Sequence, residues 1–302
     1  IMSFNLIPAF SMSDIQDRDT KTIAELKSAL TTHGFFTITD HGIADEILAA
    51  SYSLSKDFFS LPVNIKNEYA HPESAGARGY TPFGKETAVG ETTPDLKEFW
   101  HHGPNTDQSY DPRIARNISV SEIEQFNGQF DLLFAQLNQL GMKVLSAIAV
   151  ILNKEPDFFD SWALKGNSVL RLIHYPPIED SSNVLRARAH EDINLITLLV
   201  GAEESGLEVQ NPNDEWIPIA AKSKSIVCNI GDMMQLVTRS KLKSTSHRVV
   251  DHNSSSSASR YSMPFFLHPS PEIELCSIVD DSTESISAHD FLEERLKAIK
   301  LY

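Results

Sequence analysis

The stretch Ala189-His190-Glu191-Asp192, followed by the apolar run Leu195-Ile196-Thr197-Leu198-Leu199, decides the fold and chemistry that we expect of this chain. Side chains at positions i and i+2 of a β-strand point to the same face, so we expect His190 and Asp192 to reach one metal ion from one strand. His247 supplies a second imidazole further along the chain. Two imidazoles and one carboxylate are typical ligands of a non-haem Fe(II) ion whose other coordination positions stay open.

The tripeptide Arg260-Tyr261-Ser262 predicts a second element of the same site. By the same alternation, Arg260 and Ser262 share one face of a strand. A guanidinium can grip a carboxylate through two parallel hydrogen bonds, and we expect the hydroxyl to add a third. The sequence therefore predicts a metal ion and, near it, a clamp for an acidic small molecule.

Composition restricts the partners of this chain. Of its 302 residues, 41% are hydrophobic and 22% are charged, which suits one elaborated catalytic domain. The formal net charge of −15 argues against nucleic acid and against anionic membrane surfaces as partners. The two cysteines are too few for a disulfide scaffold, and the sequence suggests neither a secretory signal nor an apolar run of membrane-spanning length. We therefore expect a cytoplasmic monomer that acts on a small molecule.

Periodicity in the first half of the chain predicts helices flanking the catalytic part. Helices are expected over residues 22–30 and 45–59, and a strand over residues 35–39. The capping-box pattern Ser121-Glu122-Ile123-Glu124 is expected to open the longest helix. Its apolar stripe, which we interpret as packing surface, consists of Phe126, Phe130, Leu133, Leu137, Leu140, Val144 and Ile148.

From residue 168 onward, short β-type runs alternate with turns. They cover residues 169–175, 195–200, 207–210, 216–219, 225–230, 233–238, 246–250 and 260–267, and a helix is expected over 288–300. This spacing is typical of a double-sheet jelly roll. We expect a mainly β fold with flanking helices and a double-stranded β-helix core. Residues 1–120 would form an α/β region packed on residues 121–302, the whole being one compact unit.

Read in order, these segments resemble the isopenicillin-N-synthase-like family of Fe(II)/2-oxoglutarate-dependent oxygenases. The matching stretches outside the metal and clamp motifs include Gly34-Phe35-Phe36, Asp40-His41-Gly42-Ile43, Arg78-Gly79-Tyr80, Lys97-Glu98-Phe99-Trp100, Tyr175-Pro176-Pro177 and Asn229-Ile230-Gly231-Asp232. The resemblance extends over nearly the whole chain and implies the family's jelly roll.

Carried over residue by residue, the resemblance implies roles for both motifs. His190, Asp192 and His247 would bind iron. Arg260 and Ser262 would hold the distal carboxylate of 2-oxoglutarate. Tyr175 would add a further contact, although a Tyr before Pro-Pro could also simply pack. The implied cofactors are Fe(II), 2-oxoglutarate and O2, with ascorbate as an activator, and succinate and CO2 are the coproducts.

The resemblance is less specific about the substrate. By position, the pocket would use Arg78 and Phe83 of one loop, together with Trp100, Arg188 and Phe266. Arg188 precedes His190 by two residues, so alternation could aim it at the same cavity and favour a substrate with a carboxylate. The alternative is a surface arginine paired with a nearby acid.

Two further features leave choices open. Glu191 stands where the family more often has a small residue, and it would either add negative charge beside the iron or pair with Arg186 or Arg188. His101 and His102 are adjacent, so on a strand they would point to opposite faces and are not expected to form a second metal site.

The function expected from the sequence is hydroxylation, desaturation or cyclisation of a small organic metabolite with 2-oxoglutarate as cosubstrate. One alternative is an Fe(II) oxidase of the same fold that does not use 2-oxoglutarate, in which Arg260 and Ser262 would grip the substrate. An alternative of another class is a non-catalytic protein that binds a small acid.

Overall fold

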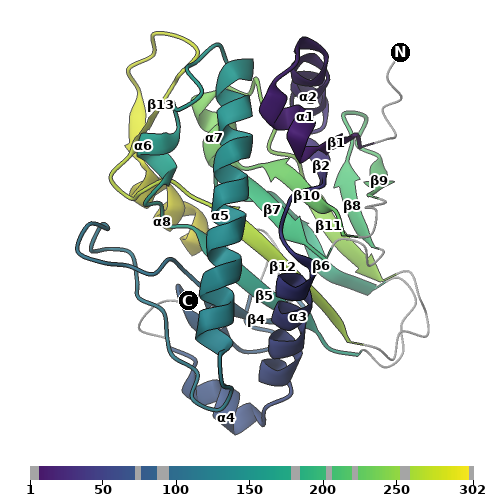
Figure 1. The fold of residues 1–302 in the computed structure, drawn as a ribbon, viewed down its shortest axis with the longest axis vertical. Helices are drawn as coiled ribbons and strands as arrows, with labels where there is room; N and C mark the ends of the chain where they lie inside the picture. Colours follow the sequence, from purple (N-terminus) through teal and green to yellow (C-terminus); the bar gives the residue numbers. More distant parts are fainter. Residues whose placement is uncertain are drawn as a thin grey trace.

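The computed structural model describes residues 7–71, 76–86, 95–177, 184–201, 206–219, 224–251 and 259–298. Most of its strands form two sheets (Figure 1). The larger sheet has eight strands in the order β1-β2-β10-β7-β12-β5-β4-β3, and the smaller sheet has four in the order β6-β11-β8-β9. Apart from the parallel pair β1 and β2, neighbouring strands in both sheets are antiparallel.

The larger sheet comprises β1 (Ala9–Ser11), β2 (Phe35–Thr39), β3 (Gly79–Thr81), β4 (Glu98–His102), β5 (Val169–Tyr175), β7 (Ile196–Val200), β10 (Ile226–Ile230) and β12 (Arg260–Leu267). The smaller sheet comprises β6 (Val184–His190), β8 (Leu207–Gln210), β9 (Trp216–Pro218) and β11 (His247–Asp251), and a separate hairpin comprises β13 (Glu274–Cys276) and β14 (Ser285–Ser287). The helices are α1 (Met12–Asp17), α2 (Thr20–Thr32), α3 (Asp45–Phe59), α4 (Val63–Glu68), α5 (Phe126–Ile151), α6 (Asp160–Ala163), α7 (Asp232–Val237) and α8 (Ala288–Ala298).

The two sheets enclose part of the apolar core between them, as the predicted jelly roll requires. Each strand sends alternate side chains into this space. The buried residues in the two clusters between the sheets are Phe35, Leu207, Val209, Ile217, Ile219 and Val227 in one, and Phe99, Ile173, Tyr175 and Ala187 in the other. The predicted fold class is confirmed.

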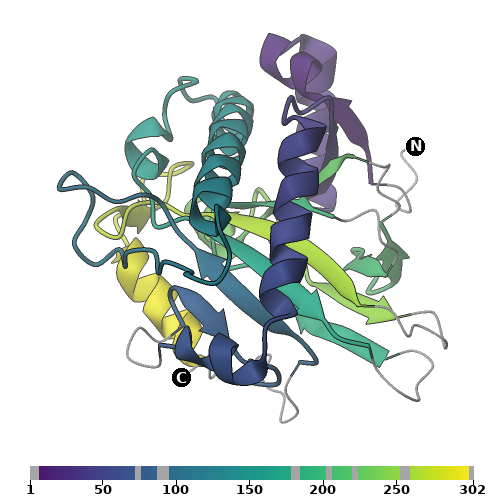
Figure 2. The same ribbon diagram turned by 60° about the horizontal axis from the view of Figure 1, so that its bottom comes forward.

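The long helix α5 covers the outer face of the larger sheet, with α3 alongside it (Figures 1 and 2). Every residue of the predicted apolar stripe of α5 is buried, so the stripe is packing surface as expected. By length and composition alone, α5 would also be long and apolar enough to cross a membrane, contrary to the expectation that no such run exists. However, 56% of its most apolar window is buried within the fold, which is typical of a core helix.

One predicted strand is wrong. Residues 233–238, expected as a strand, belong largely to helix α7. Such a short apolar run fits both the helical and the strand period, and here the chain around it decides. The backbone N–H of Asp232 donates to the carbonyl of Asp192 at 2.7 Å, and that of Met233 donates to the carbonyl of Ile193 at 3.1 Å. These bonds satisfy N–H groups that a helix start leaves without an internal partner.

The predicted start of the long helix is also wrong. Helix α5 begins at Phe126 after Gln125, whose side chain makes no capping hydrogen bond. The residues of the capping-box pattern instead contact Tyr69, whose hydroxyl donates to the Glu122 carboxylate and accepts from the Ser121 backbone N–H. Conversely, β6 was not among the predicted runs, although it carries His190 at its end.

Phe58 joins the helical layer to the larger sheet, and its removal should destabilise the fold. Its ring is fully buried, with centroids of Tyr69, Tyr80, Trp100 and Phe126 at 6.1, 5.9, 4.9 and 5.3 Å. We expect Phe58→Ala to lower the free energy of unfolding by about 3–5 kcal/mol, measured by urea denaturation.

The control for this prediction is Leu132→Ala on the exposed face of α5, where the side chain is 43% exposed. It should change the free energy of unfolding by no more than about 0.5 kcal/mol. Equal losses in the two variants would contradict the assignment of Phe58 to the core.

Candidate metal centre

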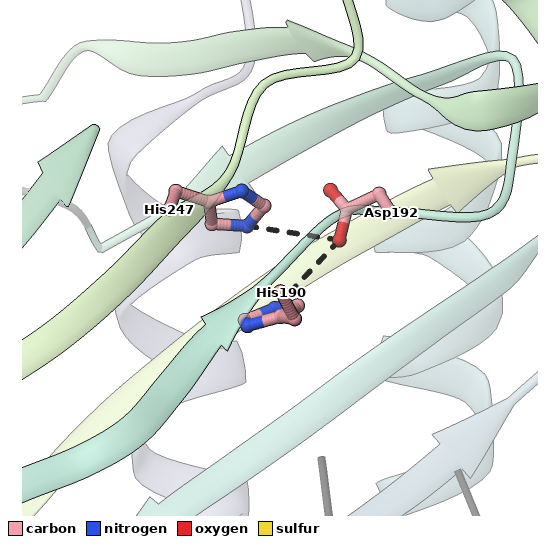
Figure 3. Close-up of side chains that lie close together, drawn as sticks. All are labelled: His190, Asp192 and His247. Carbon is pink, nitrogen blue, oxygen red and sulfur yellow. Dashed lines mark ion pairs between the residues drawn. The ribbon is translucent and has the colours of Figure 1, made fainter. Parts of the chain in front are cut away.

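Three predicted ligands come together at one end of the smaller sheet (Figure 3). His190 ends β6, His247 begins β11, and the two are cross-strand partners. Oδ1 of Asp192 lies 3.9 Å from Nε2 of His190 and 3.7 Å from Nε2 of His247. Asp192 lies beyond the end of β6, so the expectation that it shares a strand with His190 is wrong, although the two side chains still converge.

Backbone carbonyls fix the orientation of both imidazoles. Nδ1 of His190 lies 2.7 Å from the carbonyl oxygen of Arg188, and Nδ1 of His247 lies 3.2 Å from that of Thr245. Since a carbonyl can only accept, Nδ1 carries the proton in each ring and Nε2 presents its lone pair. Burial, and next the neighbouring His247, lower the pKa of His190 to about 4, so its ring is neutral near pH 7, as a metal ligand must be.

Two residues of the larger sheet hold the Asp192 carboxylate through hydrogen bonds. Its Oδ2 accepts hydrogen bonds from Oγ1 of Thr197 at 2.6 Å and from Nδ2 of Asn229 at 2.8 Å. Burial alone would raise the pKa of Asp192, but the two imidazoles and these two hydrogen bonds outweigh it and lower the pKa. The carboxylate is thus ionised, with Oδ1 directed at the two Nε2 atoms. This donor set fits Fe(II).

Glu191 does not belong to the cluster of the three ligands, and its side chain hydrogen-bonds with Asp232. It interacts electrostatically with Asp232 and Arg295, and partial burial together with the charge of Asp232 raises its pKa. Within the described part of the chain it pairs with neither Arg186 nor Arg188, so that expectation is wrong. Arg186 is buried and donates to the carbonyl of Pro176 instead.

The three residues expected to bind 2-oxoglutarate also lie close together. Arg260 and Ser262 are on β12, and Tyr175 of β5 is the cross-strand partner of Arg260. The guanidinium carbon of Arg260 lies 5.9 Å from the centre of the Tyr175 ring. A Cβ on Gly206 would lie 3.1 Å from Nη1 of Arg260, which shows that this side chain reaches across to the smaller sheet.

Two of the residues expected in the substrate pocket are not suited to it. Trp100 is fully buried against Phe58 and Phe126 in the core on the helical side of the larger sheet. The alternation of β4 instead turns Phe99 and His101 toward the smaller sheet. Phe83 is 48% exposed, with no described contact to the three ligands.

The alternation of side chains along β6 does not determine the direction of the Arg188 side chain. His190 pairs with His247 and Ala187 pairs with Val249, so β6 contains an extra residue between these pairs. Such a bulge breaks the i, i+2 rule. The backbone N–H of Arg188 donates to Oδ1 of Asp95 at 3.3 Å, and its Nε lies 4.0 Å from the same oxygen. Arg188 therefore pairs with a nearby acid, as in the alternative expectation, and this acid is Asp95.

A buried network of charged side chains lies beside His190 and is not predicted by the sequence patterns. Nζ of Lys97 lies 3.0 Å from Oδ2 of Asp95 and 3.6 Å from Oε1 of Glu86. Nη1 of Arg171 lies 3.1 Å from Oε2 of Glu86. Burial would raise the pKa of Glu86, but Arg171 and Lys97 lower it to about 2. One signal was available, because Arg171 shares the inward face of β5 with Tyr175 and is a charged residue in an apolar run.

The remaining candidates lie around this network. The guanidinium carbon of Arg171 is 4.2 Å from the centre of the Phe99 ring and 5.3 Å from that of Phe266. Nε of Arg171 donates to Nε2 of His101 at 2.7 Å, whereas His102 contacts Asp131 at 2.7 Å. The adjacent histidines therefore point to different surroundings, as expected.

Comparison with known proteins gives consistent matches. Residues 7–122 match the family described as "non-haem dioxygenase in morphine synthesis N-terminal", and residues 166–269 match the 2OG-Fe(II) oxygenase superfamily. The chain is 32% identical to the 2-oxoglutarate-dependent dioxygenase citB of Monascus ruber, over 86% of this chain and 84% of that protein.

Two solved structures are similar over nearly their whole length. A 2OG-Fe(II) oxygenase family protein from Caulobacter crescentus is 42% identical with a TM-score of 0.89, covering 97% of this chain and 99% of that one. A full-length Neurospora crassa protein in complex with alpha-KG is 26% identical with a TM-score of 0.87, covering 99% and 98%. The same Neurospora protein has also been solved with alpha-KG and thymine.

Adjacent acids should behave differently toward a metal. We expect Asp192→Ala to abolish tight binding of Fe(II), because it removes the only carboxylate oxygen that faces the two imidazoles among the described residues. Glu191→Ala is the matched control and should keep the metal, since its side chain is turned toward Asp232. Calorimetric titration with Fe(II) under anaerobic conditions measures both. Equal affinity in the two variants would show that the ligand assignment is wrong.

Proposed function

The chain belongs to the 2OG-Fe(II) oxygenase superfamily, and we propose that it hydroxylates a small organic metabolite at an iron ion held by His190, Asp192 and His247. Its relatives are 2-oxoglutarate-dependent dioxygenases, and the enzyme needs Fe(II), 2-oxoglutarate and O2. The observation that carries the proposal is the convergence of two imidazole Nε2 atoms on one carboxylate oxygen.

The chain's own residues prepare this site for the reaction. When bound, Fe(II) with 2-oxoglutarate and O2 supplies the oxidising power for the substrate C–H bond, with succinate and CO2 as coproducts. The carbonyls of Arg188 and Thr245 keep both imidazoles in the ligating tautomer. Thr197 and Asn229 keep Asp192 from rotating, because each holds its Oδ2. Such supporting hydrogen bonds typically contribute about 10- to 100-fold in metal affinity.

Arg260, Ser262 and Tyr175 are proposed to bind the distal carboxylate of 2-oxoglutarate. A guanidinium and a hydroxyl on the same face of β12 offer parallel donors to one carboxylate. The ring of Tyr175, which is 3% exposed, forms a wall beside the guanidinium. The low exposure of Ser262, 6%, favours a strong interaction because little water competes.

An assay of succinate formation tests the proposed reaction. Protein reconstituted with Fe(II) and ascorbate should convert 2-oxoglutarate to succinate, and a member of a metabolite panel should raise the rate and gain one oxygen atom by mass spectrometry. Desaturated or ring-closed products would replace hydroxylation as the outcome. Substrate oxidation that needs O2 but not 2-oxoglutarate would instead assign the chain to the oxidases of this fold.

Arg260→Lys tests the cosubstrate clamp. Lysine keeps the charge but not the planar fork, so the substitution is not conservative at a carboxylate site. Loss of a desolvated, charge-assisted pair costs about 2–5 kcal/mol. The apparent affinity for 2-oxoglutarate should therefore fall by roughly one to three powers of ten, while Fe(II) affinity changes little. Ser262→Ala should act in the same direction by about 0.5–1.5 kcal/mol.

The matched control for the clamp is Arg113→Lys, an exposed arginine paired with Asp111, which should leave 2-oxoglutarate affinity unchanged. An Arg260→Lys enzyme with normal 2-oxoglutarate affinity but weakened binding of the prime substrate would move the clamp from cosubstrate to substrate.

A further inference from the structure

The smaller sheet supports the two histidine ligands differently. His247 lies on β11, an inner strand, and pairs with Val209 of β8 on one side and with His190 of β6 on the other. His190 ends β6, which is an edge strand of the described sheet, so its ladder runs on one side only. An edge strand presents a row of backbone groups that no neighbouring strand satisfies. The position of His190 therefore depends on support from outside this sheet.

A bulge disturbs the one ladder that β6 has. Between the pair of His190 with His247 and the next pair along, β6 contains two residues, Arg188 and Ala189, where β11 contains one. A bulge disrupts the ladder locally and leaves the extra residue unpaired in it. Yet the carbonyl oxygen of Arg188 is the group that lies 2.7 Å from Nδ1 of His190. The orientation of one metal ligand thus depends on a backbone segment that the sheet supports poorly.

The Asp95 carboxylate supports this segment from the side where a further strand would lie in a wider sheet. Its Oδ1 accepts from the backbone N–H of Arg188 at 3.3 Å, and Nε of the same arginine lies 4.0 Å from that oxygen. Only the φ and ψ angles of Arg188 separate this N–H from the carbonyl that faces His190. A bond that holds the N–H therefore restricts the direction of the carbonyl, and with it the direction of the imidazole.

Asp95 is itself held in place by its neighbours. Its side chain is 4% exposed, and its Oδ2 accepts from Nζ of Lys97 at 3.0 Å. Its backbone N–H donates to the carbonyl of Glu86 at 2.9 Å. Burial would lower the pKa of Lys97, but the charges of Glu86 and Asp95 outweigh it and raise the pKa, so the lysine is charged near pH 7. One carboxylate oxygen is thus fixed by Lys97, and the other is directed at Arg188.

We propose that Asp95 is a positioning residue for the metal centre, which aligns His190 through the peptide of Arg188 and so strengthens the binding of Fe(II). It acts through two successive hydrogen bonds and not as a ligand of the ion. The proposal rests on the proposed function, because it takes His190 as an iron ligand. Groups that orient a ligand from behind typically contribute about 10- to 100-fold in metal affinity.

Metal titration of two Asp95 variants tests the proposal. Asp95→Ala removes the acceptor of the Arg188 N–H, so we expect the affinity for Fe(II) to fall by about 10-fold. Asp95→Asn keeps an oxygen acceptor in nearly the same volume and should restore most of the lost affinity. Anaerobic calorimetric titration of the full chain measures both variants against the parent.

Asp131→Ala is the matched control. Oδ1 of Asp131 lies 2.7 Å from Nε2 of His102, which is fully buried, but this pair lies on the helical side of the larger sheet. The control therefore removes an acid that holds another buried histidine, and it should keep the Fe(II) affinity of the parent chain. Should Asp95→Ala fail to fold, Asp95→Leu combined with Lys97→Met replaces it, because removal of both partners leaves neither charge of the pair buried alone.

The Co(II)-loaded protein gives a readout that a general loss of stability would not change. Co(II) bound at Nε2 is paramagnetic and shifts the Nδ1–H signal of each ligand histidine far outside the ordinary proton spectrum. We expect two such signals in the parent chain. In Asp95→Ala one of them should broaden, because the loosened contact with the Arg188 carbonyl lets this proton exchange faster with water. The signal of His247 should stay unchanged, since its Nδ1 faces the carbonyl of Thr245.

The outcomes separate this proposal from the proposed function. Equal Fe(II) affinity in Asp95→Ala and the parent chain overturns the role of Asp95, and so does an equal loss in Asp95→Ala and Asp131→Ala. A parallel change of both Nδ1–H signals overturns it as well, because it indicates a general disturbance of the site. These measurements require metal binding but no turnover. A parent chain that binds Fe(II) but forms no succinate overturns the proposed function and leaves the comparison of the Asp95 variants valid.

Discussion

The hydrogen bonds from Thr197 and Asn229 to Oδ2 of Asp192 are the interactions on which the site depends. Both donors lie on the larger sheet, where Thr197 of β7 and Asn229 of β10 are cross-strand partners, whereas both imidazoles lie on the smaller sheet. A single carboxylate therefore joins the two halves of the jelly roll at their open end. Helix α7 reinforces this point, because its first N–H groups bond to the carbonyls of Asp192 and Ile193. The spacing of the sheets is thus fixed at the place where a metal ion needs three donors to meet.

Charge is distributed differently at the surface and in the pocket. The chain has a formal net charge of −15, counted over all its charged side chains, and this charge determines its long-range field. Inside the pocket, the low polarisability of the surroundings makes each unmatched charge count for far more than the sum over the surface. Beside the metal centre, Lys97, Arg171 and Arg188 share the carboxylates of Glu86 and Asp95. An acidic protein can in this way hold several cations next to its metal ligands.

Much of the fold and the cluster of His190, Asp192 and His247 could be predicted from the sequence. The alternation of short β runs predicted the double sheet, and the apolar stripe predicted the face by which α5 packs. The predictions that are wrong concern features that depend on neighbours distant in sequence. Residues 233–238 form a helix because the segment around Asp192 accepts its first N–H groups. Trp100 was placed in the pocket by position, but strand alternation turns it into the core and turns Phe99 and His101 inward.

The bulge in β6 and the buried ion pairs could not be predicted from the sequence pattern. The extra residue in β6 breaks the alternation that would have aimed Arg188 from His190, and nothing in the local sequence marks it. The network of Glu86, Asp95, Lys97 and Arg171 joins residues up to 85 positions apart. Residue types and spacing predicted the three metal ligands, which the structure brings together, whereas the clamp stays a prediction. The acid that each buried cation contacts depends on the fold and could not be predicted.

The strand order of the larger sheet has a consequence for how the chain is made. Both edges, β1 and β3, and their neighbours β2 and β4 come from the first third of the chain, while β10, β7, β12 and β5 between them come from the last half. Strands β2 and β4 must therefore wait for β10 and β5, which are synthesised much later, although each already has one early neighbour. Such non-local pairing slows folding and leaves open strand edges exposed in the meantime. Nascent chains of this enzyme should accordingly depend on chaperones that shield those edges until synthesis ends.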